Sequence, residues 1–180
     1  MATDTRAQWN WLIDTYWYVT PPDLPALQLD PADNILSWLV DQTVWHISGY
    51  KNGYFWGVTG ALMYDVGESM PTRGPLSKIT HVSLLGTVFP DGQVQITFQP
   101  NGNNSDNAPT TGYGKIIQIG QAYTFEMQMN TPRGSNRMLH WANMMQTRPG
   151  EASFAKLPGV DYSVPQMLEG ASYPEFGDSD

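Results

Sequence analysis

Three sharp turns, each between stretches of alternating apolar residues, constrain the fold of this chain more than any other feature of its sequence. Asn52-Gly53 and Asp91-Gly92 are strong hairpin signals, and Gly120-Gln121 is a further candidate. Asn-Gly and Asp-Gly supply the positive φ angles that two-residue hairpin turns require. The predicted strands cover about 43–51, 54–62, 79–90, 93–99, 113–119, 122–130 and 137–147. The chain is therefore predicted to be mainly β, an antiparallel meander of about seven strands.

A helical pattern precedes the predicted strands. Five apolar residues recur at the spacing of one helix face, namely Trp9, Leu12, Ile13, Tyr16 and Trp17. Thr5 with Gln8 has the spacing of a capping box, and Pro21-Pro22 ends the pattern. The sequence thus predicts one N-terminal helix over about 5–18. Sequential strands behind a single helix are most simply arranged as a small barrel that the helix closes at one end.

The length of 180 residues is that of one domain with material for a sizeable core. We expect a single barrel domain over 1–180, with strands within about 43–147 and an extended C-terminal strap over 149–180. Segments 65–75 and 100–111 are rich in Gly, Pro, Asn and Asp. They are predicted to be mobile loops at the rim of the barrel.

This order of strands resembles the lipocalin-like (calycin) barrels and, less closely, the cone-shaped barrels of the nuclear-transport-factor-like superfamily. The resemblance covers about residues 5–147 and rests on architecture alone. It implies a barrel that encloses one small ligand, and it carries no functional residues over to this chain.

The charge balance argues against several classes of partner. The net charge is -8, and the nine basic residues are scattered along the chain. Phosphate binding needs clustered Lys and Arg, so neither nucleic acid nor an anionic membrane surface is expected. No apolar run approaches the roughly 20 residues of a membrane span, and the start lacks the pattern of a signal peptide, so we expect a cytoplasmic protein. The absence of cysteine removes thiolate nucleophiles and thiolate metal sites.

Three histidines lie on predicted strands and are the candidates for proton transfer, because an ordinary pKa of about 6.5 suits a general base at neutral pH. His81 shares a face of its strand with apolar residues and is expected to point into the barrel. His46 shares a face with Tyr50, and this pair could polarise a ligand oxygen. His140 could face either way. Each histidine could equally be a core or aromatic-patch residue without a chemical role.

No metal and no cofactor are expected. The histidines lack the compact spacing of metal sites. No helix follows Gly112 and Gly114 to complete a phosphate loop. Lys115 is predicted to pair with Glu126 across two strands on an exposed face, although a polar barrel interior would instead make Glu126 a pocket base.

The content of aromatic and thioether residues predicts a cavity for a hydrophobic or aromatic small molecule, since Met adapts to irregular surfaces and aromatic rings stack. The candidate ligand-binding residues are Trp45, Trp56, Phe98, Tyr123, Phe125, Met127 and Trp141.

Two functions are consistent with such a cavity. One is a cofactor-independent enzyme of lyase, isomerase or cyclase type that uses His81, His46, Tyr50 or His140. The other is a non-catalytic carrier or sensor. A structural or assembly role is the third alternative. Both faces of the first hairpin are apolar, so either the N-terminal helix or a second subunit is expected to cover the outer one, and self-association into a homo-oligomer is predicted.

Overall fold

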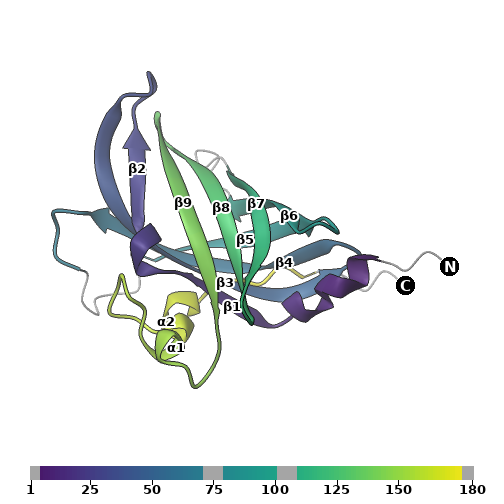
Figure 1. Ribbon diagram of the computed structural model, residues 1–180. Helices are drawn as coiled ribbons and strands as arrows, with labels where there is room; N and C mark the ends of the chain where they lie inside the picture. The colour runs from purple at the N-terminus through teal and green to yellow at the C-terminus, as the bar shows by residue number, and fades with distance from the viewer. Residues whose placement is uncertain (1–4, 71–78, 101–108, 176–180) are drawn as a thin grey trace.

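A computed structural model describes residues 5–70, 79–100 and 109–175 as a closed antiparallel β-barrel (Figure 1). The strands are β1 (Thr15–Val19), β2 (Pro25–Leu29), β3 (Ile35–Lys51), β4 (Tyr54–Asp65), β5 (Thr80–Val88), β6 (Gln93–Pro100), β7 (Thr110–Ile119), β8 (Ala122–Arg133) and β9 (Asn136–Thr147). Two 3-10 helices, η1 (Thr5–Leu12) and η2 (Pro21–Asp23), and two short α-helices, α1 (Ala152–Ala155) and α2 (Val164–Leu168), complete the described chain. The mainly β prediction is confirmed in this form, which is compatible with a calycin-like fold. The predicted rim loops fall largely on 71–78 and 101–108, outside the described residues.

One strand position of the barrel is interrupted. β1 pairs with β3 at 44–47 and with β9 at 144–147, and β2 pairs with the same two strands at 35–40 and 137–139. β1 and β2 are therefore successive halves of one position, so nine strands build an eight-position barrel. The prediction of about seven strands missed both halves. η2 separates them because its two prolines cannot donate hydrogen bonds to a sheet.

η1 closes the end of the barrel where the hairpin turns lie. Trp9 donates from Nε1 to the carbonyl of Phe89 at 3.1 Å, and Gln8 donates from Nε2 to the carbonyl of Pro90 at 2.7 Å. Trp9 and Leu12 are buried in the main core inside the barrel. The opposite end of the barrel, where β2 and the start of β3 project together, is called the open end below (Figure 1).

The predicted N-terminal helix over 5–18 is wrong in type and in length. Only Thr5–Leu12 is helical, as a 3-10 helix, whereas the α-helices of the described chain are C-terminal. The segment TYWYV over 15–19 is instead β1, with side chains that alternate between buried and half-buried. Its β-branched and aromatic residues favour a strand, and pairing with both β3 and β9 outweighs the marginal stability of a short helix.

Two of the predicted hairpins have the expected register next to their turns, although the predicted pairing of His46 with Thr59 is wrong, because His46 pairs with Val58. Asn52 and Gly53 take φ values of 54° and 91°, and Lys51 pairs with Tyr54 on either side of that turn. Ile119 pairs with Ala122 across Gly120-Gln121. These turns are set by local backbone preferences, which is why short sequence signals located them.

The β5–β6 hairpin has a longer loop than predicted. Val88 pairs with Val94, and the amide of Phe89 donates to the carbonyl of Gln93. A slip of one residue turns every side chain of a strand to the other face. Leu84 therefore points into the core, and His81 lies on the outer wall.

The C-terminal strap, residues 148–175, forms a second layer outside β3 and β4 (Figure 1). Leu157, Val160 and Met167 of the strap pack with Val44 and Val58 of the barrel wall. The outer face of the first hairpin is thus covered around Val44 and Val58 by the strap of the same chain, and not by the N-terminal helix as one alternative had it. Tyr54 beside the turn is 56% exposed, and self-association stays a prediction.

The strap makes close contacts with β4 and β5 on the outer wall of the barrel. A Cβ atom on Gly60 would lie 2.1 Å from the carbonyl oxygen of Met167, so the approach there requires glycine. The hydroxyl of Tyr64 donates to the carbonyl of Gly159 at 2.7 Å, and Nε2 of His81 donates to that of Met167 at 2.9 Å.

Candidate functional site

The three histidines lie in three different places. His46 on β3 and His81 on β5 are on the outer wall, while His140 on β9 lines the interior. The prediction that His81 points into the barrel is wrong, because the β5–β6 register differs by one residue. Among the residues that the structure describes, no group of three His, Cys, Asp or Glu side chains could hold a metal ion.

His46 and Tyr50 do not share a face. A β-bulge shifts the β3–β4 register between Ile47 and Gly49, and such a bulge turns the following residues relative to the preceding ones. Tyr50 consequently belongs to the core at the closed end, where its hydroxyl donates to the carbonyl of Arg6 at 2.5 Å. The predicted joint action of His46 and Tyr50 on one ligand has no geometric basis.

A buried acid and base meet inside the barrel instead. Nδ1 of His140 lies 2.9 Å from Oδ2 of Asp41, and the two side chains are only 1% and 5% exposed. Oδ1 of Asp41 accepts a hydrogen bond from the hydroxyl of Thr43 at 2.7 Å. The contact between Nδ1 of His140 and Asp41 does not have the geometry of a hydrogen bond. We therefore describe it as an ion pair.

The interruption between β1 and β2 positions this pair. β9 residues 140–143 lie opposite the break and have no strand partner on that side. Asp23 of η2 takes the place of a strand: its carbonyl accepts from Nε2 of His140 at 2.7 Å, and its carboxylate accepts from Asn143. On the other side of the break, the amide of Asp41 donates to the carbonyl of Leu24 at 2.8 Å.

These contacts decide the protonation of His140. The Asp23 carbonyl can only accept, so Nε2 carries a proton, and Nδ1 faces a carboxylate that also accepts. Burial is the largest influence on the pKa of His140 and lowers it, but the charge and close contact of Asp41 and the carbonyl of Asp23 together outweigh burial. The pKa is therefore raised above 6.5.

Asp41 and His140 face a cavity of about 90 Å³ at the open end of the barrel. Its floor contains the buried polar residues Asp41, Thr43, Thr59 and His140 beside apolar side chains. The apolar lining residues are Ala61, Met63, Val82, Phe98, Met129 and Met138, and the remaining ones are Thr80, Thr110 and Thr131. The cavity is thus a mainly apolar space with one concentrated polar group of side chains.

The predicted ligand-binding residues divide into four sets. Phe98 lines the cavity, whereas Trp45, Phe125 and Met127 are fully buried in the packed core and do not line it. Tyr123 stacks on Trp11 at the closed end, with ring centroids 4.4 Å apart. Trp56 and Trp141 lie on the outer wall, where Trp141 is 50% exposed.

Lys115 and Glu126 pair across β7 and β8 as predicted. The neighbours of Glu126 on β8, Phe125 and Met127, both point into the core. Glu126 consequently faces outward, and it is not a base of the cavity.

Sequence reasoning missed Asp41, the acid of the site. The signal was present, because Asp41 and Thr43 continue the alternation of Trp45 and Ile47 toward the start of β3. A carboxylate on the buried face of a strand is rare unless it has a partner. The predicted strand began at about 43, which left Asp41 in a loop.

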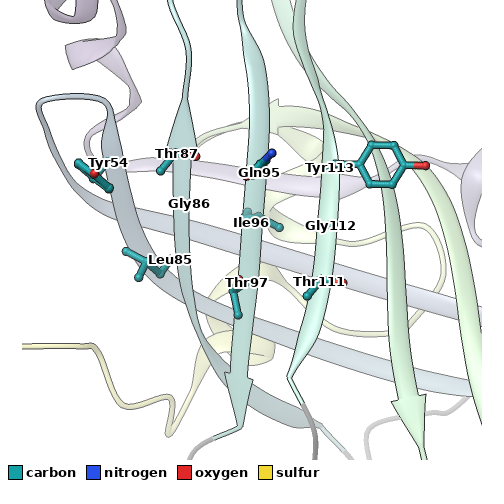
Figure 2. A pocket seen from close by; sticks show the side chains of 10 residues that line it. All are labelled: Tyr54, Leu85, Gly86, Thr87, Gln95, Ile96, Thr97, Thr111, Gly112 and Tyr113. Atoms are coloured by element: carbon teal, nitrogen blue, oxygen red, sulfur yellow. The ribbon is translucent and has the colours of Figure 1, made fainter.

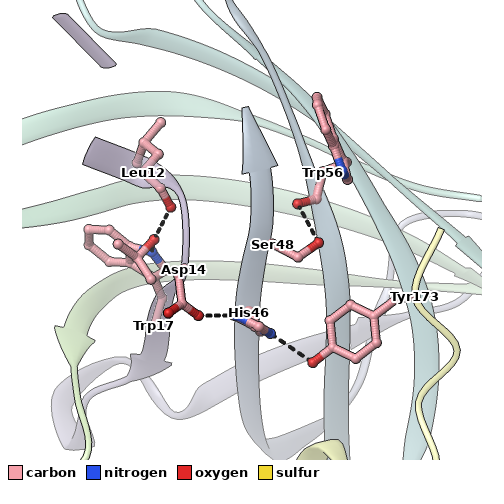
Figure 3. Close-up of polar contacts among 8 residues, drawn as sticks. Leu12, Asp14, Trp17, His46, Ser48, Trp56 and Tyr173 are labelled. Carbon is pink, nitrogen blue, oxygen red and sulfur yellow. Dashed lines mark hydrogen bonds and ion pairs between the residues drawn. The ribbon is translucent and has the colours of Figure 1, made fainter. Parts of the chain in front are cut away.

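A second histidine and aspartate pair lies on the outer wall (Figure 3). Nε2 of His46 is 3.0 Å from Oδ1 of Asp14, and Nδ1 is 2.7 Å from the hydroxyl of Tyr173 in the strap. Tyr16 stacks on the imidazole with ring centroids 4.2 Å apart. Asp14 reaches His46 because a positive φ of 58°, which Asp tolerates, turns the chain between η1 and β1.

The outer contacts also determine which group donates. An ionised Asp14 can only accept, so a neutral His46 carries its proton on Nε2 and accepts at Nδ1 from the phenol of Tyr173. Burial, followed by the nearby Tyr16 and Asp14, raises the pKa of Tyr173, so the phenol keeps its proton. The cluster of Asp14, Tyr16, His46 and Tyr173 therefore links the strap to the outer wall of the barrel. The side chain of Asp14 is 78% exposed to water.

A hollow of about 490 Å³ on the outer wall spans β4 to β7 (Figure 2). Tyr54, Leu85 and Tyr113 stand around it, and the described residues that line it include no Asp, Glu, His, Lys or Arg. It offers contact area but no acid or base comparable to those of the inner cavity.

Among the described residues, no helix is long and apolar enough to cross a membrane. The chain matches no protein family model, no curated protein and no solved structure.

Proposed function

We propose that this barrel is a carrier or sensor that binds a small, mainly apolar molecule carrying one polar group. The observation that supports it is the buried Asp41–His140 pair, which faces the cavity at the open end. Binding sites for small molecules are typically apolar with a few placed polar groups that fix the orientation of the ligand. Burying an ion pair contributes little net stability, so its position on a cavity favours a role in recognition.

The size of the cavity limits what it can enclose. Its volume of about 90 Å³ is smaller than the roughly 150 Å³ engineered cavity that holds one benzene molecule. A polycyclic guest therefore does not fit without movement of the rim. A short or narrow group fits, with the rest of a longer ligand extending past Thr80 and Thr110 toward the open end.

Proton-transfer catalysis is the second candidate, and the buried contact of 2.9 Å between His140 and Asp41, a base beside an acid, is what favours it. A lyase or isomerase needs an acid and a base at separate positions around the substrate. Of the predicted catalytic residues only His140 lines the cavity, and its acid partner is on the same wall. The geometry thus supports binding better than turnover.

Methyl-labelled methionine offers a local test of binding. Met63, Met129 and Met138 line the cavity, whereas Met167 lies in the strap and serves as an internal control. Small hydrophobic alcohols, ketones and amines are titrated while the methyl resonances are recorded. Shifts at the three cavity methyls with Met167 unchanged are expected.

Ala61→Leu, which fills the cavity, should abolish those shifts, and Ala122→Leu at the exposed β7–β8 turn should not. If no compound moves the cavity methyls, or if Ala61→Leu leaves the shifts unaltered, the proposal is wrong.

A further inference from the structure

We infer that the polar group of the ligand is an uncharged hydrogen-bond donor, a hydroxyl or a neutral N–H, and not a carbonyl, a carboxylate or an ammonium group. This inference rests on the proposed binding function and specifies the ligand class of the same cavity. It follows from an account of every donor and acceptor on the cavity floor.

The donors on the floor are already used. The hydroxyl of Thr43 donates to Asp41 at 2.7 Å, and that of Thr59 donates to the carbonyl of Val44 at 3.1 Å. Nε2 of His140 donates to the carbonyl of Asp23, and Nδ1 faces Asp41. A threonine hydroxyl has one hydrogen and an imidazole ring has at most two, so none of these three side chains has a donor left for a ligand. The other hydroxyls of the lining, on Thr80, Thr110 and Thr131, are less buried and lie nearer the opening than the floor.

The acceptors on the floor are only partly used. A carboxylate offers about four lone-pair sites, and Asp41 uses two of them, one toward Thr43 and one toward His140. The hydroxyl oxygens of Thr43 and Thr59 can also accept. Nε1 of Trp45 is a buried donor without a partner among the described residues, but Trp45 does not line the cavity. Among the residues that the structure describes, the floor therefore presents acceptors and no free side-chain donor.

Charge removes the ionic alternatives. The Asp41 carboxylate lies 2.9 Å from the His140 imidazole, and the raised pKa of His140 favours the charged ring, so the two groups offset each other and leave no full counter-charge for an ionic ligand. An ammonium group would meet His140, and a carboxylate would meet Asp41. Either ion would also lose its hydration in a mainly apolar cavity, which is unfavourable without a full counter-charge.

Three matched probes test the inference on the wild-type protein: cyclopentanol as donor, cyclopentanone as acceptor and cyclopentylamine as cation. Dissociation constants are read from the methyl shifts of Met63, Met129 and Met138. Cyclopentanol should bind at least about tenfold more tightly than the other two, the difference expected when a carboxylate gains one hydrogen bond.

Equal or tighter binding of cyclopentanone or cyclopentylamine overturns the inference and leaves the proposed function intact. No shift with any probe contradicts both.

Two threonine variants sharpen the test. Thr43→Val removes the donor to Asp41 and leaves one carboxylate oxygen free, so the preference for cyclopentanol over cyclopentanone should rise several-fold. Thr124→Val is the matched control, because its buried hydroxyl donates to the carbonyl of Met144 at 3.0 Å and it does not line the cavity, so it should leave the preference unchanged.

Should Thr43→Val fail to fold, Asp41→Asn replaces an acceptor oxygen by a donor amide and should reduce the preference. An unchanged preference in whichever of these two variants folds contradicts the inference.

Discussion

The same pair of side chains, histidine and aspartate, occurs twice in this barrel in opposite surroundings. The inner pair, His140 and Asp41, and the outer pair, His46 and Asp14, have nearly equal contact distances of 2.9 and 3.0 Å. Their aspartates differ in exposure, 5% against 78%. Because the distances are nearly equal, we expect burial to decide how much stability is lost when each pair is broken and which pair can recognise a ligand.

The largest difference is expected on removal of the two aspartates. Asp41→Ala leaves the buried His140 without its counter-charge and Thr43 without its acceptor, which should lower the free energy of unfolding by about 3–5 kcal/mol. Asp14→Ala should lower it by less than about 1 kcal/mol, because water replaces the exposed carboxylate. Urea titrations of both variants measure the comparison. Comparable losses would show that burial does not distinguish the pairs.

A second variant tests whether the strap and the cavity respond independently of each other. Gly60→Ala places a Cβ atom against the Met167 carbonyl, so the strap must shift, at an expected cost of about 1–3 kcal/mol. Gly67→Ala is the control, since nothing lies within 4 Å of its added Cβ, and it should change stability by less than about 0.5 kcal/mol. The methyl resonances of Met63 and Met138 should stay in place while that of Met167 moves. Movement of all three would mean that the two regions are coupled.

The pH dependence of stability should come from the inner pair. The pKa of His140 is raised in the folded protein, where Asp41 and the Asp23 carbonyl outweigh the opposing effect of burial. The folded state therefore keeps its proton to a higher pH than the unfolded state does. The contribution of the His140 proton to the free energy of unfolding is complete below pH 6.5. It is lost as the pH rises through the pKa of the folded state, at up to about 1.4 kcal/mol per pH unit.

His140→Gln keeps a polar side chain but cannot titrate, so it should remove that slope above pH 6.5, whereas Asp14→Asn should retain it. Unfolding free energies at several pH values measure the slopes. A slope that persists in His140→Gln would assign it to another group.

The sequence predicted the parts of the fold that depend on neighbouring residues. Asn52-Gly53 forms its turn because those two residues tolerate positive φ, so a local signal was sufficient. The β5–β6 loop uses Gly92 at φ 86° in a longer turn, and the assumption of a two-residue loop turned His81 to the wrong face.

The candidate site was harder to predict because it arises from a break in a strand. Asp41 could have been found from the alternation along β3, but its partner His140 could not. Their meeting depends on η2, whose Asp23 contacts His140 where β1 and β2 leave β9 unpaired. A strand divided between two short segments gives weak periodicity, and β1 was mistaken for part of a helix for the same reason.

The smallest effect is expected at the outer pair. Tyr173→Phe removes the hydroxyl that contacts His46 but keeps the ring, and Tyr173 is 44% exposed, so water can replace the lost bond. We expect a loss of less than about 1 kcal/mol in the free energy of unfolding.

Tyr64→Phe is the matched variant. The hydroxyl of Tyr64 also donates to the strap, but its acceptor is the carbonyl of Gly159, which is buried. An unpaired buried carbonyl should raise that loss to about 1–2 kcal/mol. Urea titration of the two variants side by side compares one hydrogen bond in two degrees of burial. If Tyr173→Phe proved the more costly, the outer cluster would hold the strap more firmly than its exposure allows.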